Sequence, residues 1–203
     1  KVLHHKSGVR EYIYGFPIHS MAIGKSKYPK LSESRLVVFV GGGGSTKSGI
    51  QNSIQINGCE VDAEGTLSMK QLLNHDCGPD LISNVTMSSD GQLLACSVKG
   101  ECRLYKFCRG EQVSIRQIYQ WESDFHTSYP CINVLSFNSG GTKLAIGGDD
   151  NVLKVYNLNL IDNKKFAISK AVKLEGHKRA VLDAKFSPVG DLLASSSRDG
   201  KCI

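Results

Sequence analysis

A glycine-rich segment is the part of this sequence whose residue types most clearly could do chemistry. Residues 41–52 read Gly-Gly-Gly-Gly-Ser-Thr-Lys-Ser-Gly-Ile-Gln-Asn, and they follow the apolar stretch 36–40. Four successive glycines lose backbone entropy on folding and provide no side chains for packing. Such a segment is useful where the backbone itself must approach a partner or an ion. We therefore expect a functional loop between two strands of one sheet.

The segment does not fit the common nucleotide-binding motifs. A Walker loop has glycine directly before its lysine and a helix after it. Here Thr46 precedes Lys47, and an alternating strand pattern follows Asn52. The dinucleotide-binding motif also needs a helix after its glycines. The sequence therefore predicts that this chain does not bind a nucleotide directly.

Other reactive residues give no enzymatic pattern. His177 and Asp199 could form a dyad, but no serine or cysteine lies in a recognisable nucleophile elbow beside them. The seven cysteines lack zinc-knuckle spacing and are odd in number, so we interpret them as reduced thiols of a cytosol-facing domain. No pair of acids or metal-binding group stands out. The sequence thus argues against a hydrolase or a transferase.

Three segments of the chain align without gaps and indicate the elements that position the loop. Residues 87–95, 137–145 and 186–194 each contain the end of a strand, a turn with a glycine, and the start of the next strand. The period of about 50 residues is in the range of propeller blades. Short strands separated by turn residues, with almost no helical periodicity, agree with this. We predict an all-β fold, a WD-repeat β-propeller.

The repeats divide the chain into three and a half expected blades. The expected ranges are about 14–76, about 80–124, about 130–175 and, for an incomplete fourth blade, about 178–203. In the third blade the expected strands are 132–137, 143–148, 152–157 and 167–174. Three and a half blades cannot close a ring and would leave open strand edges. We therefore interpret the chain as the N-terminal part of a longer protein.

The fourth repeat resembles the WD-repeat signature. Gly176 and His177 are followed by Ser-Arg-Asp-Gly at 197–200, and Asp150 of the third repeat aligns with Asp199. The closing Trp-Asp pair is absent from every repeat. In WD repeats the histidine and the aspartate hydrogen-bond across a blade. The resemblance therefore implies structural roles for His177, Asp199 and Asp150.

A more specific resemblance lies in the first repeat. The segment 14–18 (Tyr-Gly-Phe-Pro-Ile), the strand 37–40 and the loop 41–52 are similar to the cytosolic domain of the prolactin regulatory element-binding protein family. That family includes exchange factors that activate the Sar-type small GTPase for COPII coat assembly. The resemblance implies a seven-bladed propeller at the cytosolic face of the endoplasmic reticulum membrane, with a membrane anchor that this chain lacks. It implies the GTPase as partner and the COPII machinery as an indirect one.

The same resemblance assigns roles to the loop residues. It places Asn52 and Ile50 at the centre of exchange, and it makes the rest of the exchange loop Gly41, Gly42, Gly43, Gly44, Lys47 and Gly49. Exchange needs no covalent step, only a surface that binds the nucleotide-free GTPase better than the loaded form. Asn52 could donate and accept hydrogen bonds there, and Ile50 could act as an apolar wedge.

The resemblance also raises the question of a potassium ion. In fungal relatives a potassium ion held by oxygen ligands organises the loop, and Lys47 stands where those relatives have a neutral residue. We hypothesise that the Lys47 ammonium replaces the cation. Exchange that is insensitive to replacing potassium would support this hypothesis, and strong potassium dependence would contradict it.

Two alternatives from other classes stay open at this stage. Propeller faces are general protein-binding platforms, so a non-catalytic WD-repeat scaffold is one, and Asn52 would then only satisfy a turn. The formal net charge of +6 allows nucleic-acid binding, but the sequence contains no zinc finger, recognition helix or aromatic-basic strand motif. No signal peptide is visible, and no apolar run reaches the roughly 18 residues that span a bilayer.

Overall fold

The described part of the chain is built from β-strands. The computed structural model describes residues 2–4, 10–25, 35–44, 46–108, 112–122, 131–160 and 166–203. These residues form 16 strands and one short 3-10 turn, η2 (Thr46–Ser48), and they contain no α-helix. Consequently none of them belongs to a helix that is long and apolar enough to cross a bilayer. The predicted all-β class is confirmed.

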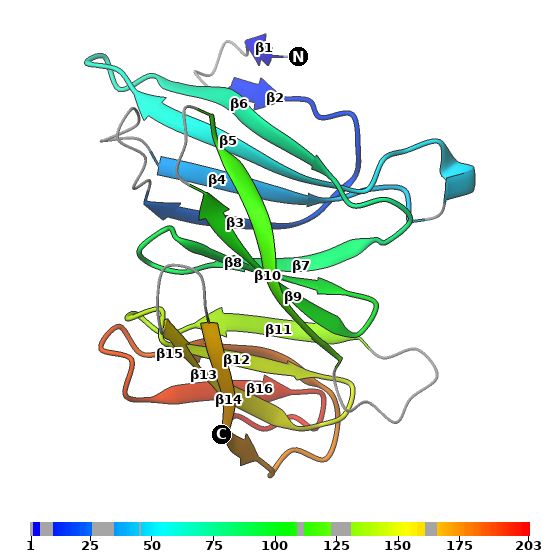
Figure 1. Cartoon of the computed structure of the whole chain (residues 1–203), viewed down its shortest axis with the longest axis vertical. Helices are drawn as coiled ribbons and strands as arrows, with labels where there is room; N and C mark the ends of the chain where they lie inside the picture. The colour runs from blue at the N-terminus through cyan, green and yellow to red at the C-terminus, as the bar shows by residue number, and fades with distance from the viewer. Residues whose placement is uncertain are drawn as a thin grey trace.

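Four antiparallel sheets follow one another along the chain (Figure 1). Sheet 1 consists of β3 (Ile18–Lys25), β4 (Arg35–Gly41), β5 (Ser53–Val61) and β6 (Leu67–Asp76). Sheet 2 consists of β7 (Ile82–Met87), β8 (Leu93–Val98), β9 (Glu101–Cys108) and β10 (Ser114–Glu122). Sheet 3 consists of β11 (Ile132–Phe137), β12 (Lys143–Gly148), β13 (Leu153–Leu160) and β14 (Phe166–Leu174). Sheet 4 consists of β15 (Val181–Phe186) and β16 (Leu193–Ser197), and a small hairpin of β1 (Val2–His4) and β2 (Arg10–Tyr12) precedes sheet 1.

The strands predicted for the third repeat agree closely with sheet 3. β11 and β12 have the expected bounds, whereas β13 starts one residue later and ends three residues later than expected. β14 starts one residue earlier than expected and ends where expected. After β16, Ser196 forms an isolated bridge with Cys202. Within the expected blades, residues 26–34, 45, 109–111, 123–124, 130 and 161–165 lie outside the described residues.

Successive sheets pack face to face around separate apolar cores. On β8, Leu94 and Cys96 face sheet 1, while Leu93 and Ala95 face sheet 3. All six residues of β8 are buried, which explains why its sequence is apolar at every position except Ser97 rather than an alternation. The core between sheets 3 and 4 is smaller and centres on Val134 and Val181 of the innermost strands. This stacking of one sheet on the next is the arrangement of propeller blades.

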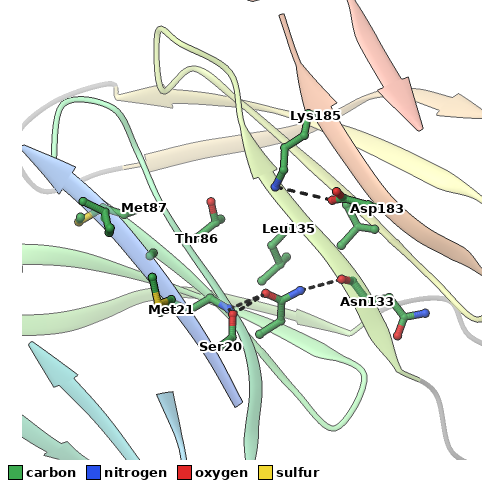
Figure 2. Close-up of a pocket in the computed structure, with 13 residues that line it drawn as sticks. Ser20, Met21, Thr86, Met87, Asn133, Leu135, Asp183 and Lys185 are labelled. Carbon is green, nitrogen blue, oxygen red and sulfur yellow. Dashed lines mark hydrogen bonds and ion pairs between the residues drawn. The ribbon is translucent and has the colours of Figure 1, made fainter. Parts of the chain in front are cut away.

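The innermost strands β3, β7, β11 and β15 surround a cavity of about 280 Å³ (Figure 2). Each of these strands has a one-residue irregularity near its start, which tilts polar groups toward the neighbouring sheet. Asn84 accepts from the Ser20 hydroxyl at 3.1 Å and donates to the Asn133 carbonyl at 2.7 Å. Asn133 in turn donates to the Val181 carbonyl at 3.1 Å. A row of hydrogen bonds therefore joins all four sheets at one end of the cavity.

The glycines of the repeated turns are required by contacts between sheets. Gly91 has φ 66°, and a Cβ on it would lie 1.9 Å from the Lys25 carbonyl oxygen of sheet 1. Gly190 has φ 81°, and a Cβ there would lie 2.9 Å from Ser139 Oγ of sheet 3. The turns at Gly91 and Gly190 thus need a left-handed residue without a side chain. The repeat that was visible in the sequence reflects this packing.

Candidate functional site

The glycine-rich loop joins β4 and β5, which are neighbours in sheet 1. β4 ends at Gly41, β5 begins at Ser53, and these two residues are paired in the ladder. Residues 42–52 therefore leave the sheet and return to it at the same place. Figure 1 shows η2 near the tip of this loop, away from the stacked sheets. The prediction that the loop connects two strands of one sheet is confirmed.

Two of the four glycines lie where the two sides of the loop nearly touch. A Cβ on Gly42, whose φ is 146°, would lie 2.3 Å from Asn52 Oδ1 and 2.5 Å from Asn52 Cα. A Cβ on Gly43 would lie 2.0 Å from Ser48 Oγ. No larger residue fits at either position without moving backbone. The glycine run therefore permits a narrow loop whose two sides are in contact.

Asn52 holds this loop together from inside. Asn52 is 2% exposed, and its Oδ1 accepts a hydrogen bond from the Gly44 N–H at 3.0 Å. Its Nδ2 donates to the Gly78 carbonyl at 3.0 Å, and its own backbone carbonyl accepts from the Cys77 N–H at 2.9 Å. The Asn52 amide therefore has both a donor and an acceptor partner within the protein. This geometry makes it a brace for the loop.

Ile50 and Lys47 lie on the outer side of the loop. Ile50 is 37% exposed, and its N–H donates to Ser48 Oγ at 3.2 Å. Lys47 belongs to η2, and its residue is exposed. A partially exposed isoleucine on a constrained loop can insert into a partner at a low entropic cost. Among the loop residues assigned from the sequence, Lys47, Gly49 and Ile50 are exposed, whereas Asn52 is buried.

The oxygens inside the loop are neutral, which is the donor type that potassium prefers in backbone-lined sites. Asn52 Oδ1 and Ser48 Oγ each already accept a backbone N–H of the loop. No group of three or more His, Cys, Asp or Glu that could bind a metal occurs among the described residues. A loop cation would therefore be held chiefly by backbone carbonyls. The chemistry of the loop suits a monovalent cation better than a divalent one.

A second polar cluster lies in sheet 4, around His177. Its Nδ1 is 3.3 Å from Asp199 Oδ2, and its Nε2 is 2.9 Å from Ser195 Oγ. The side chains of His177 and Asp199 are 4% and 6% exposed, and Ser195 is 7% exposed. Ser195 is buried and sits on β16 rather than on the strained strand-to-helix turn of a nucleophile elbow. The sequence of contacts, from serine to histidine to aspartate, is that of a catalytic triad, but its role here is structural. It connects β16 to the segment before β15.

We predict that Asp199 makes the stability of sheet 4 depend on pH. The backbone N–H of Lys178, followed by that of Lys201 and by His177, lowers the pKa of its carboxyl from 3.8 to about 2. A lowered pKa in the folded state stabilises the protein above pH 3.8, and this stabilisation is lost as the pH falls through about 2. Asp199→Asn should therefore reduce the melting temperature near neutral pH and have little effect at about pH 2.

Thermal unfolding of both proteins by circular dichroism across this pH range would measure that difference. Asp183→Asn, at a 62% exposed carboxylate on β15 of the same sheet, is the matched control. A gap between the Asp199→Asn and unmodified proteins that stays constant with pH would contradict the prediction.

Asp150 occupies a different environment from Asp199. Its Oδ2 is 2.6 Å from Lys154 Nζ, and the two side chains are 11% and 3% exposed. Its Oδ1 accepts from the Val152 N–H at 3.2 Å. Among the contacts described here its partner is a lysine of its own sheet, whereas Asp199 bonds to a histidine. Sequence reasoning missed Lys154 and Ser195, although each lies on a strand where a polar residue interrupts an apolar pattern.

These sheets and turns define a WD-repeat β-propeller, and comparison with known proteins agrees. The model of the WD domain, G-beta repeat, matches residues 118–157 and 169–203. The β-propeller domain of Cps50 (Swd1) from Myceliophteria thermophila superimposes with a TM-score of 0.61 at 13% identity, over 95% of this chain and 57% of that one. Sqt1 from Chaetomium thermophilum superimposes with a TM-score of 0.59 at 18% identity, over 92% and 43%.

Curated relatives narrow this class to a family. The guanine nucleotide-exchange factors SEC12 of Rattus norvegicus and Mus musculus are each 23% identical over 226 residues, covering 93% of this chain. This similarity over nearly the whole chain supports the resemblance to the prolactin regulatory element-binding protein family that the glycine-rich loop indicated. It spans half the length of these relatives.

Proposed function

We propose that this protein is a guanine nucleotide-exchange factor for a Sar-type small GTPase. In this proposal it acts at the cytosolic face of the endoplasmic reticulum and starts COPII coat assembly. The similarity to the SEC12 exchange factors over nearly the whole chain supports the exchange activity. The structural observation that supports a particular contact site is the loop 42–52. Asn52 braces this loop where it leaves sheet 1, and Ile50 is partly exposed on it.

The chemistry that exchange requires is a difference in binding. An exchange factor binds the nucleotide-free GTPase more tightly than the loaded form, and the nucleotide therefore binds the complex more weakly by the same factor. No proton transfer or covalent intermediate is involved. A loop that is already ordered before contact loses little entropy on binding, so more of its contact energy is available to displace groups around the nucleotide.

The loop residues divide this work between them. Ile50 is the contact residue, because its apolar side chain is partly exposed on the outer side. Asn52 is a positioning residue, because its amide is buried and bonded to Gly44 and Gly78. The glycines allow the two sides of the loop to approach, and Lys47 adds a positive charge beside Ile50 in the chain.

The test is release of a fluorescent guanine nucleotide from a Sar-type GTPase. We expect the protein to accelerate release and Ile50→Ala to slow the accelerated rate about tenfold, because the wedge loses most of its apolar surface. Val189→Ala is the matched control, since Val189 is an 82% exposed residue of a turn in sheet 4. This control should leave the rate unchanged.

Two outcomes would contradict the proposal in different ways. No acceleration by the folded protein would favour a non-catalytic WD-repeat scaffold. Acceleration that Ile50→Ala does not slow would retain the exchange function and remove the loop contact. Binding of the GTPase without nucleotide release would also identify a scaffold. Steeply salt-dependent binding to DNA would point to the nucleic-acid alternative.

A further inference from the structure

The connection between sheets 1 and 2 contacts the glycine-rich loop along its inner side. This connection, residues 77–81, runs from β6 to β7. Its Cys77 N–H and Gly78 carbonyl bond to Asn52, at 2.9 Å and 3.0 Å. A Cβ added to Gly44 of the loop would lie 3.7 Å from Leu81 Cδ2 of the connection. The position of the loop therefore depends on the position of this connection.

The connection is itself held by sheet 2. The Asp80 carboxylate bridges two cations, with Oδ1 3.0 Å from Lys99 Nζ and Oδ2 2.8 Å from Arg103 Nη2. Arg103 belongs to β9, and its Nη2 is also 3.4 Å from the Glu101 carboxylate. These two cations lower the pKa of Asp80, Arg103 being the larger cause, so the carboxylate stays ionised in the physiological range.

The two halves of this bridge differ in exposure. The Arg103 side chain is 16% exposed, whereas that of Lys99 is 64% exposed. An exposed ion pair contributes little because water and salt screen it, while a partly buried pair with a guanidinium is held more firmly. The Asp80–Arg103 pair is therefore the half of the bridge that can fix the connection.

We propose that Asp80 and Arg103 are positioning residues for the glycine-rich loop, and that they set the fraction of molecules whose loop is in the binding geometry. This proposal rests on the proposed exchange function for its kinetic consequence only. The link runs from Arg103 on sheet 2 to Asp80, through the backbone of the connection to Asn52, and on to Gly44. A protein in which only a fraction of molecules is competent binds its partner more weakly by that fraction.

The proposal predicts a specific kinetic change. Asp80→Asn should raise the concentration of this protein that gives half-maximal nucleotide release by about fivefold or more. The maximal rate should stay close to that of the unmodified protein, because the loop and Ile50 are unchanged once bound. Arg103→Met should give the same pattern. Arg103→Lys should raise the half-maximal concentration less than Arg103→Met does, because it keeps the positive charge.

Two controls separate this effect from a general loss of structure. Lys99→Gln removes the exposed half of the same bridge and should change the half-maximal concentration less than about twofold. Glu175→Gln breaks an ion pair with Lys173 in sheet 3, far along the chain from the loop. It should have no effect.

Hydrogen exchange gives a second readout that does not need a GTPase. In Asp80→Asn the Gly44 and Cys77 amides, which bond to Asn52, should exchange faster, while the amides of β12 in sheet 3 should keep their protection. Unchanged protection of the loop would overturn this inference even if exchange activity is present. Faster amide exchange without any nucleotide release would retain the inference and contradict the proposed function instead.

Discussion

Asn52→Ala should nearly abolish the acceleration of nucleotide release from the GTPase. We expect the accelerated rate to fall by about a hundredfold, and by at least about tenfold. The substitution removes the acceptor of the Gly44 N–H and the donor to the Gly78 carbonyl. Both partners are then left without hydrogen bonds in a part-buried place, and each such group costs about 1–3 kcal/mol. The loop would lose its side-chain hydrogen bond to the segment between sheets 1 and 2 and keep only the backbone bond from the Cys77 N–H to the carbonyl of residue 52. Nucleotide release and urea unfolding of the same samples would measure the two effects.

The control for this prediction is another asparagine on an exposed part of the propeller. Asn159 lies on β13 in sheet 3 and is exposed, so Asn159→Ala should leave both release and stability unchanged. Asn52→Asp separates the two hydrogen bonds, because a carboxylate can still accept from Gly44 but cannot donate to Gly78. Full activity of a folded Asn52→Ala protein would show that the brace is not needed for exchange.

Asp150→Ala should destabilise the protein strongly without a direct effect on the loop. Lys154 is 3% exposed, and its ammonium is 2.6 Å from the Asp150 carboxylate. Removing the acid takes a close counter-charge away from a buried ammonium, and breaking a buried ion pair in this way typically costs about 3–5 kcal/mol. The midpoint of urea unfolding should therefore fall while the slope of the transition stays the same. The rate of nucleotide release at a temperature where the variant is folded should not change.

A second variant distinguishes the buried charge from the loss of the acid itself. Asp150→Asn combined with Lys154→Met removes both charges and should recover most of the lost stability, since neutral replacements of a buried pair are often tolerated. Lys173→Ala breaks the exposed pair with Glu175, whose side chains are 47% and 69% exposed. It should cost less than about 1 kcal/mol. A cost for Asp150→Ala as small as this would mean that Lys154 finds water or another partner.

The repeats show which features of this fold the local sequence pattern predicts. The turns with Gly91, Gly141 and Gly190 were recognisable because each must adopt a positive φ, and only glycine does so without strain. The strand bounds of sheet 3 followed from the spacing between such turns. That Gly91 also lies against the carbonyl of Lys25 could not be read from the sequence, because Lys25 belongs to another sheet.

The sequence by itself determined the all-β class, the WD-repeat propeller and the place of the glycine-rich loop between two strands. These features depend on the alternation of apolar residues and on turn residues, which act over a few positions along the chain. Only the tertiary structure decided that Asn52 is a buried brace and that Asp80 pairs with Arg103. The partners involved lie 26 and 23 residues apart in the chain. Such pairs form when the folding of whole sheets brings distant segments together, and no local periodicity records which side chains will then meet.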